Sequence, residues 1–225
     1  MPYYAGVDVG ENRANAVLLL SDDGPSRRLE LVDRYEGNPA GVVEFCRPAS
    51  RVAVDAPGGL SAGAHLKDMT VAPKFRSGRC SEIPVPGTPA VPWVTPMRLG
   101  DCPGWMRTGF EIWFGLRASG AMVAETFPAA AFYLLNGNRW PPKKTTSTGR
   151  SARLRLLARL IEFSLSRTQG CSHDYIDAVA CGAIVALGEP RHHTCSNPDG
   201  SVIWELKASA YRVGQREPQH FFPSS

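Results

Sequence analysis

The chain has 225 residues, of which 43% are hydrophobic and 20% are charged, and its formal net charge is +4. This composition excludes a wholly disordered chain, and the length suits one domain, so we expect a single domain over residues 1–225. The longest uncharged apolar run, residues 178–187, is too short to cross a bilayer, and no signal peptide is expected because Asp8 interrupts the first apolar stretch.

The first quarter of the chain predicts four strands and one short helix. Apolar runs bounded by turn residues predict strands over residues 3–8, 14–20, 29–35 and 51–55. Residues 39–46 predict a helix, because Asn38 is a favourable N-cap and Pro39 suits the first helical position.

Residues 56–120 are unusually rich in glycine and proline, with 18 of the 41 such residues in the chain. This density predicts turns and extended loop, which we interpret as an insertion after the fourth strand of a more regular scaffold. Its arginines Arg76 and Arg79 could bind a phosphate or serve as ordinary surface charges. Its aromatic residues could stack on bases, but a small core under a long loop is the favoured interpretation. These aromatics are Trp93, Trp105, Phe110, Trp113 and Phe114.

The second half alternates strands and helices. We expect a strand over residues 122–127, helices over residues 128–135, 151–165 and 173–187, and a short strand at residues 202–204. The last helix is rich in small residues and should pack closely against a sheet. Hairpin-linked strands followed by strand–helix units predict an α/β fold with a mixed sheet and helices on its faces.

Positive charge is concentrated between residues 139 and 167. This segment contains eight basic residues and one acid, Glu162, whereas the rest of the chain has a net charge of −3. Such a surface suits a polyanion such as nucleic acid, although a solvated helix face preceded by a basic loop is an equally good interpretation.

The six cysteines contain no C-x-x-C pair. Without a secretory signal, we expect reduced thiols and a cytoplasmic protein. Cys171 with His173, and His192-His193 with Cys195, lack the second paired half-site of a zinc centre, so buried thiols and a polar loop are favoured.

Five acids fall at the ends of predicted elements: Asp8, Asp55, Glu125, Asp174 and Asp177. One acid at a strand end commonly caps a turn. Several like charges brought together are costly unless a cation offsets them, and carboxylates are preferred ligands of Mg²⁺. Two such ions can activate water in phosphodiester cleavage.

Several short motifs follow one another along most of the chain, and their order and spacing are characteristic. They are Gly6-Val-Asp8-Val-Gly10, Val52-Ala-Val-Asp55-Ala-Pro57, Glu125-Thr-Phe-Pro128, Lys143-Lys144 through Gly149-Arg150, His173-Asp174-Tyr-Ile-Asp177-Ala178, and Asp199-Gly200 with Ile203-Trp204. Together they resemble the predicted-nuclease family known as domain of unknown function 429.

That resemblance implies a ribonuclease H-like fold related to bacterial Holliday-junction resolvases, with a five-stranded mixed sheet of order 3-2-1-4-5 flanked by helices. It implies a site for Mg²⁺ or Mn²⁺ at Asp8, Asp55 and Asp177, with Asp174 close by and Glu125 able to complete it.

The fourth metal ligand stays open between Glu125, Glu44 and Asp174, because Glu44 is the only acid on the first helix and lies late in it. His173 could shuttle a proton or cap the last helix.

We therefore expect a metal-dependent nuclease that cleaves a structured nucleic acid by a carboxylate-held two-metal mechanism. Its expected partner is nucleic acid rather than a membrane. The expected nucleic-acid contacts are Arg76, Arg79, Lys143, Lys144 and Arg150.

Two alternatives remain. An actin-like phosphotransferase or ATPase would use Asp8-x-Gly10 as a phosphate loop, but no second glycine-rich loop follows. A non-catalytic module would bind nucleic acid or a partner protein through the insertion.

Overall fold

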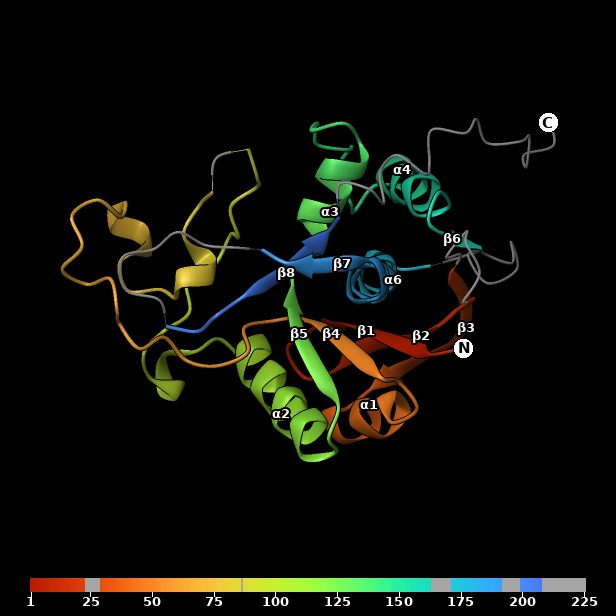
Figure 1. The fold of residues 1–225 in the computed structure, drawn as a ribbon, viewed down its shortest axis with the longest axis horizontal. Coiled ribbons are helices and arrows are strands. Elements are labelled where there is room, and N and C mark those ends of the chain that lie inside the picture. The colour runs from red at the N-terminus through yellow and green to blue at the C-terminus, as the bar shows by residue number, and fades with distance from the viewer. Residues whose placement is uncertain (23–28, 86, 163–170, 192–198, 208–225) are drawn as a thin grey trace.

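The computed structural model describes residues 1–22, 29–85, 87–162, 171–191 and 199–207. It contains a mixed eight-stranded sheet of order β6-β3-β2-β1-β4-β5-β8-β7. The five central strands have the predicted order 3-2-1-4-5, but the expectation of a five-stranded sheet is wrong because three short strands extend its edges (Figure 1).

The strands are β1 Tyr3–Val9, β2 Ala14–Ser21, β3 Leu29–Gly37, β4 Arg51–Asp55, β5 Met122–Thr126, β6 Ile161–Glu162, β7 Gly188–Pro190 and β8 Ile203–Leu206. The α-helices are α1 Pro39–Cys46, α2 Gly104–Ala118, α3 Pro128–Leu135, α4 Ser147–Leu157 and α6 His173–Leu187. Strand β1 pairs antiparallel with β2 and parallel with β4. The central strand therefore joins the antiparallel half of the sheet to the parallel half.

Helices cover both faces of the sheet. In Figure 1, α1 and α2 lie on one side, and α3, α4 and α6 lie on the other. Successive residues of a strand point to opposite faces, so Val7 and Val54 pack with the α1 and α2 core whereas Ala53 packs with Cys181 of α6. This alternation decides which side chains can meet at the end of the sheet.

Helix α6 touches β1 backbone to backbone. A Cβ atom on Gly6 would lie 2.0 Å from the carbonyl oxygen of Ala178 and 2.2 Å from the amide nitrogen of Gly182. Only glycine at position 6 permits this approach. The predicted close packing of the small-residue helix on the sheet is therefore confirmed.

The segment after β4 is only partly irregular. Its first part contains three short 3₁₀ turns, η1 Pro73–Phe75, η2 Cys80–Glu82 and η3 Leu99–Asp101. The expectation of a loop up to residue 120 is wrong, because α2 follows and buries Ile112 and Leu116. Two glycines inside α2 do not mark turns, because they allow close packing of the helix. Gly109 lies against Ala56, and Gly115 lies against Val43 of α1.

The aromatic residues of this segment are divided between core and surface. Trp93 meets Trp105 and Phe127 edge-on, with ring centroids 5.5 and 5.4 Å apart. Trp113 is buried, whereas Phe114 is exposed. The preferred interpretation of a small core is thus confirmed for Trp93 and Trp105, whereas Trp113 packs in the main core between the sheet and α1.

Helix α4 is displaced from its predicted bounds. It begins at Ser147, where the Thr146 side chain accepts a hydrogen bond from the amide of Gly149, and ends at Leu157. The chain then forms β6 beside β3, so the predicted continuation through residue 162 is wrong. Residues 163–165 lie outside the described residues.

The cysteines differ in state. Cys46, Cys102 and Cys181 are free thiols. Cys80 is disulfide-bonded, so the expectation of reduced thiols is wrong at this position. The His192-His193 and Cys195 group lies outside the described residues.

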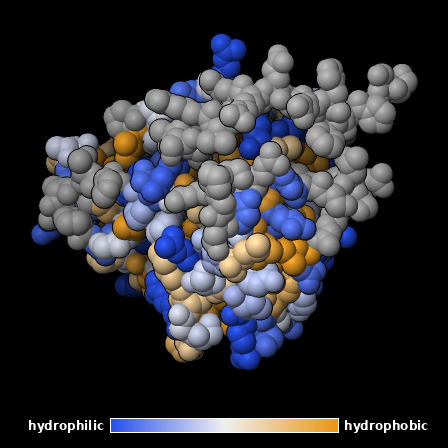
Figure 2. All heavy atoms as spheres, turned by 45° about the vertical axis from the view of Figure 1, so that its right-hand side comes forward, coloured by the Kyte–Doolittle hydropathy of each residue, from blue (hydrophilic) through white to orange (hydrophobic). Residues whose placement is uncertain are grey.

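The visible face in Figure 2 shows hydrophilic and hydrophobic side chains interspersed. Within the described part of the chain, no helix combines the length and apolar character needed to cross a bilayer.

Candidate metal and nucleic-acid site

Asp8 and Asp55 lie side by side at the same end of two neighbouring strands. The parallel register of β1 and β4 pairs Asp8 directly with Asp55. Asp8 shares a strand face with Gly6, so both carboxyls point toward α6, and a side-chain hydrogen bond joins them. The sheet therefore forces two acids 47 positions apart in the chain into direct contact.

Helix α6 contributes a third acid to this end of the sheet. Asp177 is 5% exposed, and its Oδ2 accepts a hydrogen bond from the Nζ of Lys144 at 2.6 Å. Ser172 is the N-cap of α6, so His173 does not cap the helix. Instead, Nδ1 of His173 lies 2.5 Å from Oδ1 of the more exposed Asp174.

Burial and mutual repulsion disfavour the charged forms of these aspartates. Burial, followed by the charges of Asp177 and Asp174, raises the pKa of Asp8 from 3.8 to about 8. Burial and the charge of Asp8 hold the pKa of Asp55 well above its ordinary value. Burial also raises the pKa of Asp177, against the opposing effect of Lys144. A nearby cation would relieve this unfavourable arrangement.

This electrostatic arrangement predicts a characteristic pH dependence of stability. An acid whose pKa is raised on folding binds more protons when folded, so stability is present at low pH and is lost as pH rises from the unfolded value, 3.8, toward about 8. We expect the Asp8 contribution to the free energy of unfolding of the metal-free protein to fall by about 3 kcal/mol between about pH 5.5 and about pH 8. Urea denaturation of the wild type and Asp8→Asn at both pH values measures it. An equal pH response of the two proteins would contradict the assignment.

The aspartates suit a hard divalent cation in kind. Carboxylate oxygens are the preferred ligands of Mg²⁺ and Mn²⁺, and Oδ1 of Asp55 is buried without a hydrogen-bond partner among the described residues. Their arrangement is less complete: no group of three or more His, Cys, Asp or Glu side chains in the described ranges is placed to hold a metal ion. Asp8 and Asp55 offer a pair of donors, whereas Asp177 is bound to Lys144.

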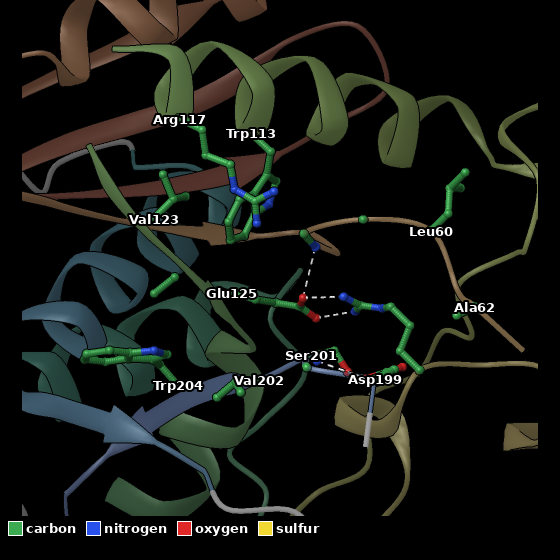
Figure 3. Close-up of a pocket in the computed structure, with 15 residues that line it drawn as sticks. Leu60, Ala62, Trp113, Arg117, Val123, Glu125, Asp199, Ser201, Val202 and Trp204 are labelled. Atoms are coloured by element: carbon green, nitrogen blue, oxygen red, sulfur yellow. Dashed lines mark hydrogen bonds and ion pairs between the residues drawn. The ribbon is translucent and has the colours of Figure 1, made fainter. Parts of the chain in front are cut away.

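Glu125 does not join these acids. It stands opposite Val54 in the register of β4 and β5, one residue out of phase with Asp55, and therefore faces the α2 side of the sheet. There its carboxylate receives two hydrogen bonds from Arg79, at 2.7 and 2.5 Å, and one from the amide of Gly58 at 3.0 Å. Figure 3 shows these contacts beside Trp113 and Arg117.

Arg79 is the centre of a buried ionic network that sequence reasoning did not predict. Its Nε also donates to Glu82 at 3.0 Å, and the Thr95 hydroxyl donates to the same carboxylate. Burial lowers the pKa of Arg79, but Glu125 and Glu82 together raise it above the ordinary value. Arg79 and Glu82 are 4% and 1% exposed, so Arg79 is not a surface charge. Their spacing of three residues was the one local signal for this pair.

A cavity of about 330 Å³ opens beside the ion pair of Arg79 and Glu125. Trp113, Arg117, Asp199 and other residues line it, and the Arg117 guanidinium stacks over the Trp113 ring at 4.7 Å. Most of these side chains lie on the α2 side of the sheet, whereas Trp204 of β8, which also lines the cavity, packs with residues of α6.

The other residues predicted to bind nucleic acid or metal do not lie together. Lys143 is exposed and Arg150 is half-buried, both at the start of α4, whereas the ammonium of Lys144 points into the acid cluster. Nε of Arg76 donates to the carbonyl of Val71 at 2.9 Å. Glu44 is exposed on α1 and pairs with Arg47, so it is on the opposite face of the sheet from the aspartates.

The basic segment is less exposed than its sequence suggests. Arg153 is buried, donates to the carbonyl of Pro142 at 2.7 Å and stacks over Phe132. Arg139, Arg155 and Arg159 are exposed, and Arg167 lies outside the described residues.

Fold and site together define an α/β protein whose mixed sheet ends in paired aspartates beneath a helix that carries a third. The chain belongs to the family described as "Protein of unknown function (DUF429)", whose model matches residues 6–199, and the predicted family resemblance is thereby confirmed.

Among solved structures, the chain is similar to RuvC from Thermus thermophilus, with 11% identity and a TM-score of 0.47 over 82% of this chain and 93% of that chain. It is similar to T. thermophilus RuvC in complex with a Holliday junction substrate, with 14% identity and a TM-score of 0.47 over 81% and 92% of the two chains. No curated protein matches the chain.

Proposed function

We propose that this protein is a metal-dependent nuclease that hydrolyses phosphodiester bonds of a structured nucleic acid by a carboxylate-held two-metal mechanism. The observation that carries the proposal is the direct pairing of Asp8 with Asp55, beneath Asp177 of α6. Buried like charges destabilise a fold, and a bound divalent cation would offset this repulsion because carboxylates are its preferred ligands.

Asp8 and Asp55 would hold the metal, and Asp177 would join them. Mg²⁺ or Mn²⁺ bound there would supply Lewis-acid activation of water and stabilisation of the leaving oxygen. The half-exposed Asp174 and His173 stand at the rim of the same site. In this arrangement His173 could accept a proton, and Asp174 would fix the orientation of its ring.

The nucleic acid would lie across the start of α4. This helix packs against α6, Arg150 and Arg155 provide basic side chains along it, and Lys143 lies in the loop just before it. Such residues bind phosphates regardless of base sequence, which suits a protein that recognises the shape of a nucleic acid.

Cleavage assays with controlled metal content test the proposal. Labelled single-stranded, duplex and four-way-junction DNA, and the corresponding RNAs, are incubated with the full chain in Mn²⁺, Mg²⁺ or EDTA. We expect cleavage of at least one substrate with metal, none in EDTA, and recovery when Mn²⁺ is restored.

Other outcomes separate the alternatives. Cleavage that persists in EDTA would contradict the metal mechanism. Binding of the nucleic acids without cleavage in either metal would identify a binding module. Tight binding of ATP in calorimetry, without nuclease activity, would favour an actin-like phosphotransferase.

A further inference from the structure

A cation already occupies the aspartate cluster: the ammonium of Lys144. Its Nζ lies 2.6 Å from Oδ2 of Asp177, and its charge also acts on Asp8 and Asp55. The three acids thus share one lysine, which lies 33 positions before Asp177 in the chain.

The backbone of Lys144 is held firmly by the start of α4. The amide and hydroxyl of Thr146 both donate to the carbonyl of Lys143, at 3.1 and 2.8 Å. Nη1 of Arg153 donates to the carbonyl of Pro142 at 2.7 Å. A Cβ on Gly149 would lie 1.9 Å from the oxygen of Lys143, so helix and loop are in close contact. These contacts therefore position the backbone of Lys144 beside the aspartate cluster.

The side chain of Lys144 is freer than its backbone. It is 43% exposed, whereas that of Asp177 is 7% exposed. A lysine has four rotatable carbon–carbon bonds, so its ammonium can move into solvent without any change in the loop.

We propose that Lys144 is a built-in counter-ion, which neutralises the aspartate cluster in the absence of metal and is displaced when a divalent cation binds. The inference rests on the proposed function, because it concerns the same metal site. A metal held by Asp177 would stand close to the ammonium that now donates to its Oδ2, and two cations in one small cluster repel each other.

Calorimetric titration with Mn²⁺ alone tests this competition without any substrate. Lys144→Met keeps the length of the side chain and removes its charge, so we expect Mn²⁺ to bind this variant about tenfold more tightly than the wild type. Lys143→Met is the matched control, because the side chain of Lys143 is exposed. The affinity of this variant for Mn²⁺ should stay within about twofold of that of the wild type.

Thermal unfolding provides an independent measurement. Without metal, Lys144→Met should melt at a lower temperature than both the wild type and Lys143→Met, because the aspartates lose their counter-ion. Added Mn²⁺ should raise its melting temperature by more than that of the wild type.

The outcomes separate the two proposals. If Lys144→Met binds Mn²⁺ no more tightly than the wild type, displacement is overturned while the metal site stands. If neither protein binds Mn²⁺, the metal site of the proposed nuclease and the displacement are overturned together.

Discussion

Replacing Asp8 or Asp55 with asparagine is expected to reduce metal-dependent cleavage about a thousandfold, because metal-ion catalysis lowers the activation barrier by several kcal/mol. Asparagine keeps the shape of the side chain but removes the charge that would hold the cation. The two acids are paired in register, so either substitution dismantles the same site. Single-turnover cleavage of the best substrate, with Mn²⁺ in excess, measures the loss.

Both variants should remain folded. Burial and mutual repulsion disfavour the charged forms of Asp8 and Asp55, so replacing one of them with a neutral amide relieves the repulsion. Melting temperatures at least equal to that of the metal-free wild type would separate a catalytic defect from unfolding. Glu44→Gln is the control, because Glu44 is exposed on the far side of the sheet and should not affect cleavage. Full activity in either aspartate variant would refute the assignment.

Arg79→Met is expected to lower the free energy of unfolding by about 4 kcal/mol, since it leaves two buried carboxylates without their counter-ion. Those carboxylates belong to Glu82 and Glu125, which are 1% and 3% exposed. Urea denaturation measures the change. Arg76→Met is a matched control, because Nε of Arg76 donates to one carbonyl oxygen and its loss should cost about 1 kcal/mol.

The ionic network around Arg79 also predicts a variant that is less stable but still cleaves. Glu125→Gln should destabilise the protein but leave cleavage by the folded fraction intact, because Glu125 faces α2 and not the aspartates. A loss of Mn²⁺ binding in this variant would show instead that Glu125 is a metal ligand.

Elements with strong local signals were predicted well. The bounds of α1, α3, α6 and β4 agree with the sequence pattern, because caps, prolines and apolar runs mark their ends. Helix α2 was missed because Gly109 and Gly115 suggested loop, whereas they allow close helix packing. The short strands β6 and β7 depend on pairing with β3 and β8, which leaves little local trace, whereas β8 was predicted at residues 202–204 from its apolar run after a turn.

The candidate site was predictable only in part. Strand-end positions identified Asp8 and Asp55, and helical spacing placed Asp177 near Asp174. Glu125 was included because it also ends a strand, yet a shift of one residue in a pleated strand moves a side chain to the other face. The partners of the charged groups were not predictable, because Lys144 and Asp177 are 33 residues apart and Arg79 and Glu125 are 46 apart.

The contact between Gly6 and Gly182 has a consequence for inactive forms of the protein. It fixes α6 on β1 through main-chain shape alone, at residues other than the acids that the two elements carry. Architecture and reactivity are therefore encoded by separate residues. A variant that lacks the aspartates would therefore keep the same arrangement of helix and sheet while losing the groups that would hold a metal.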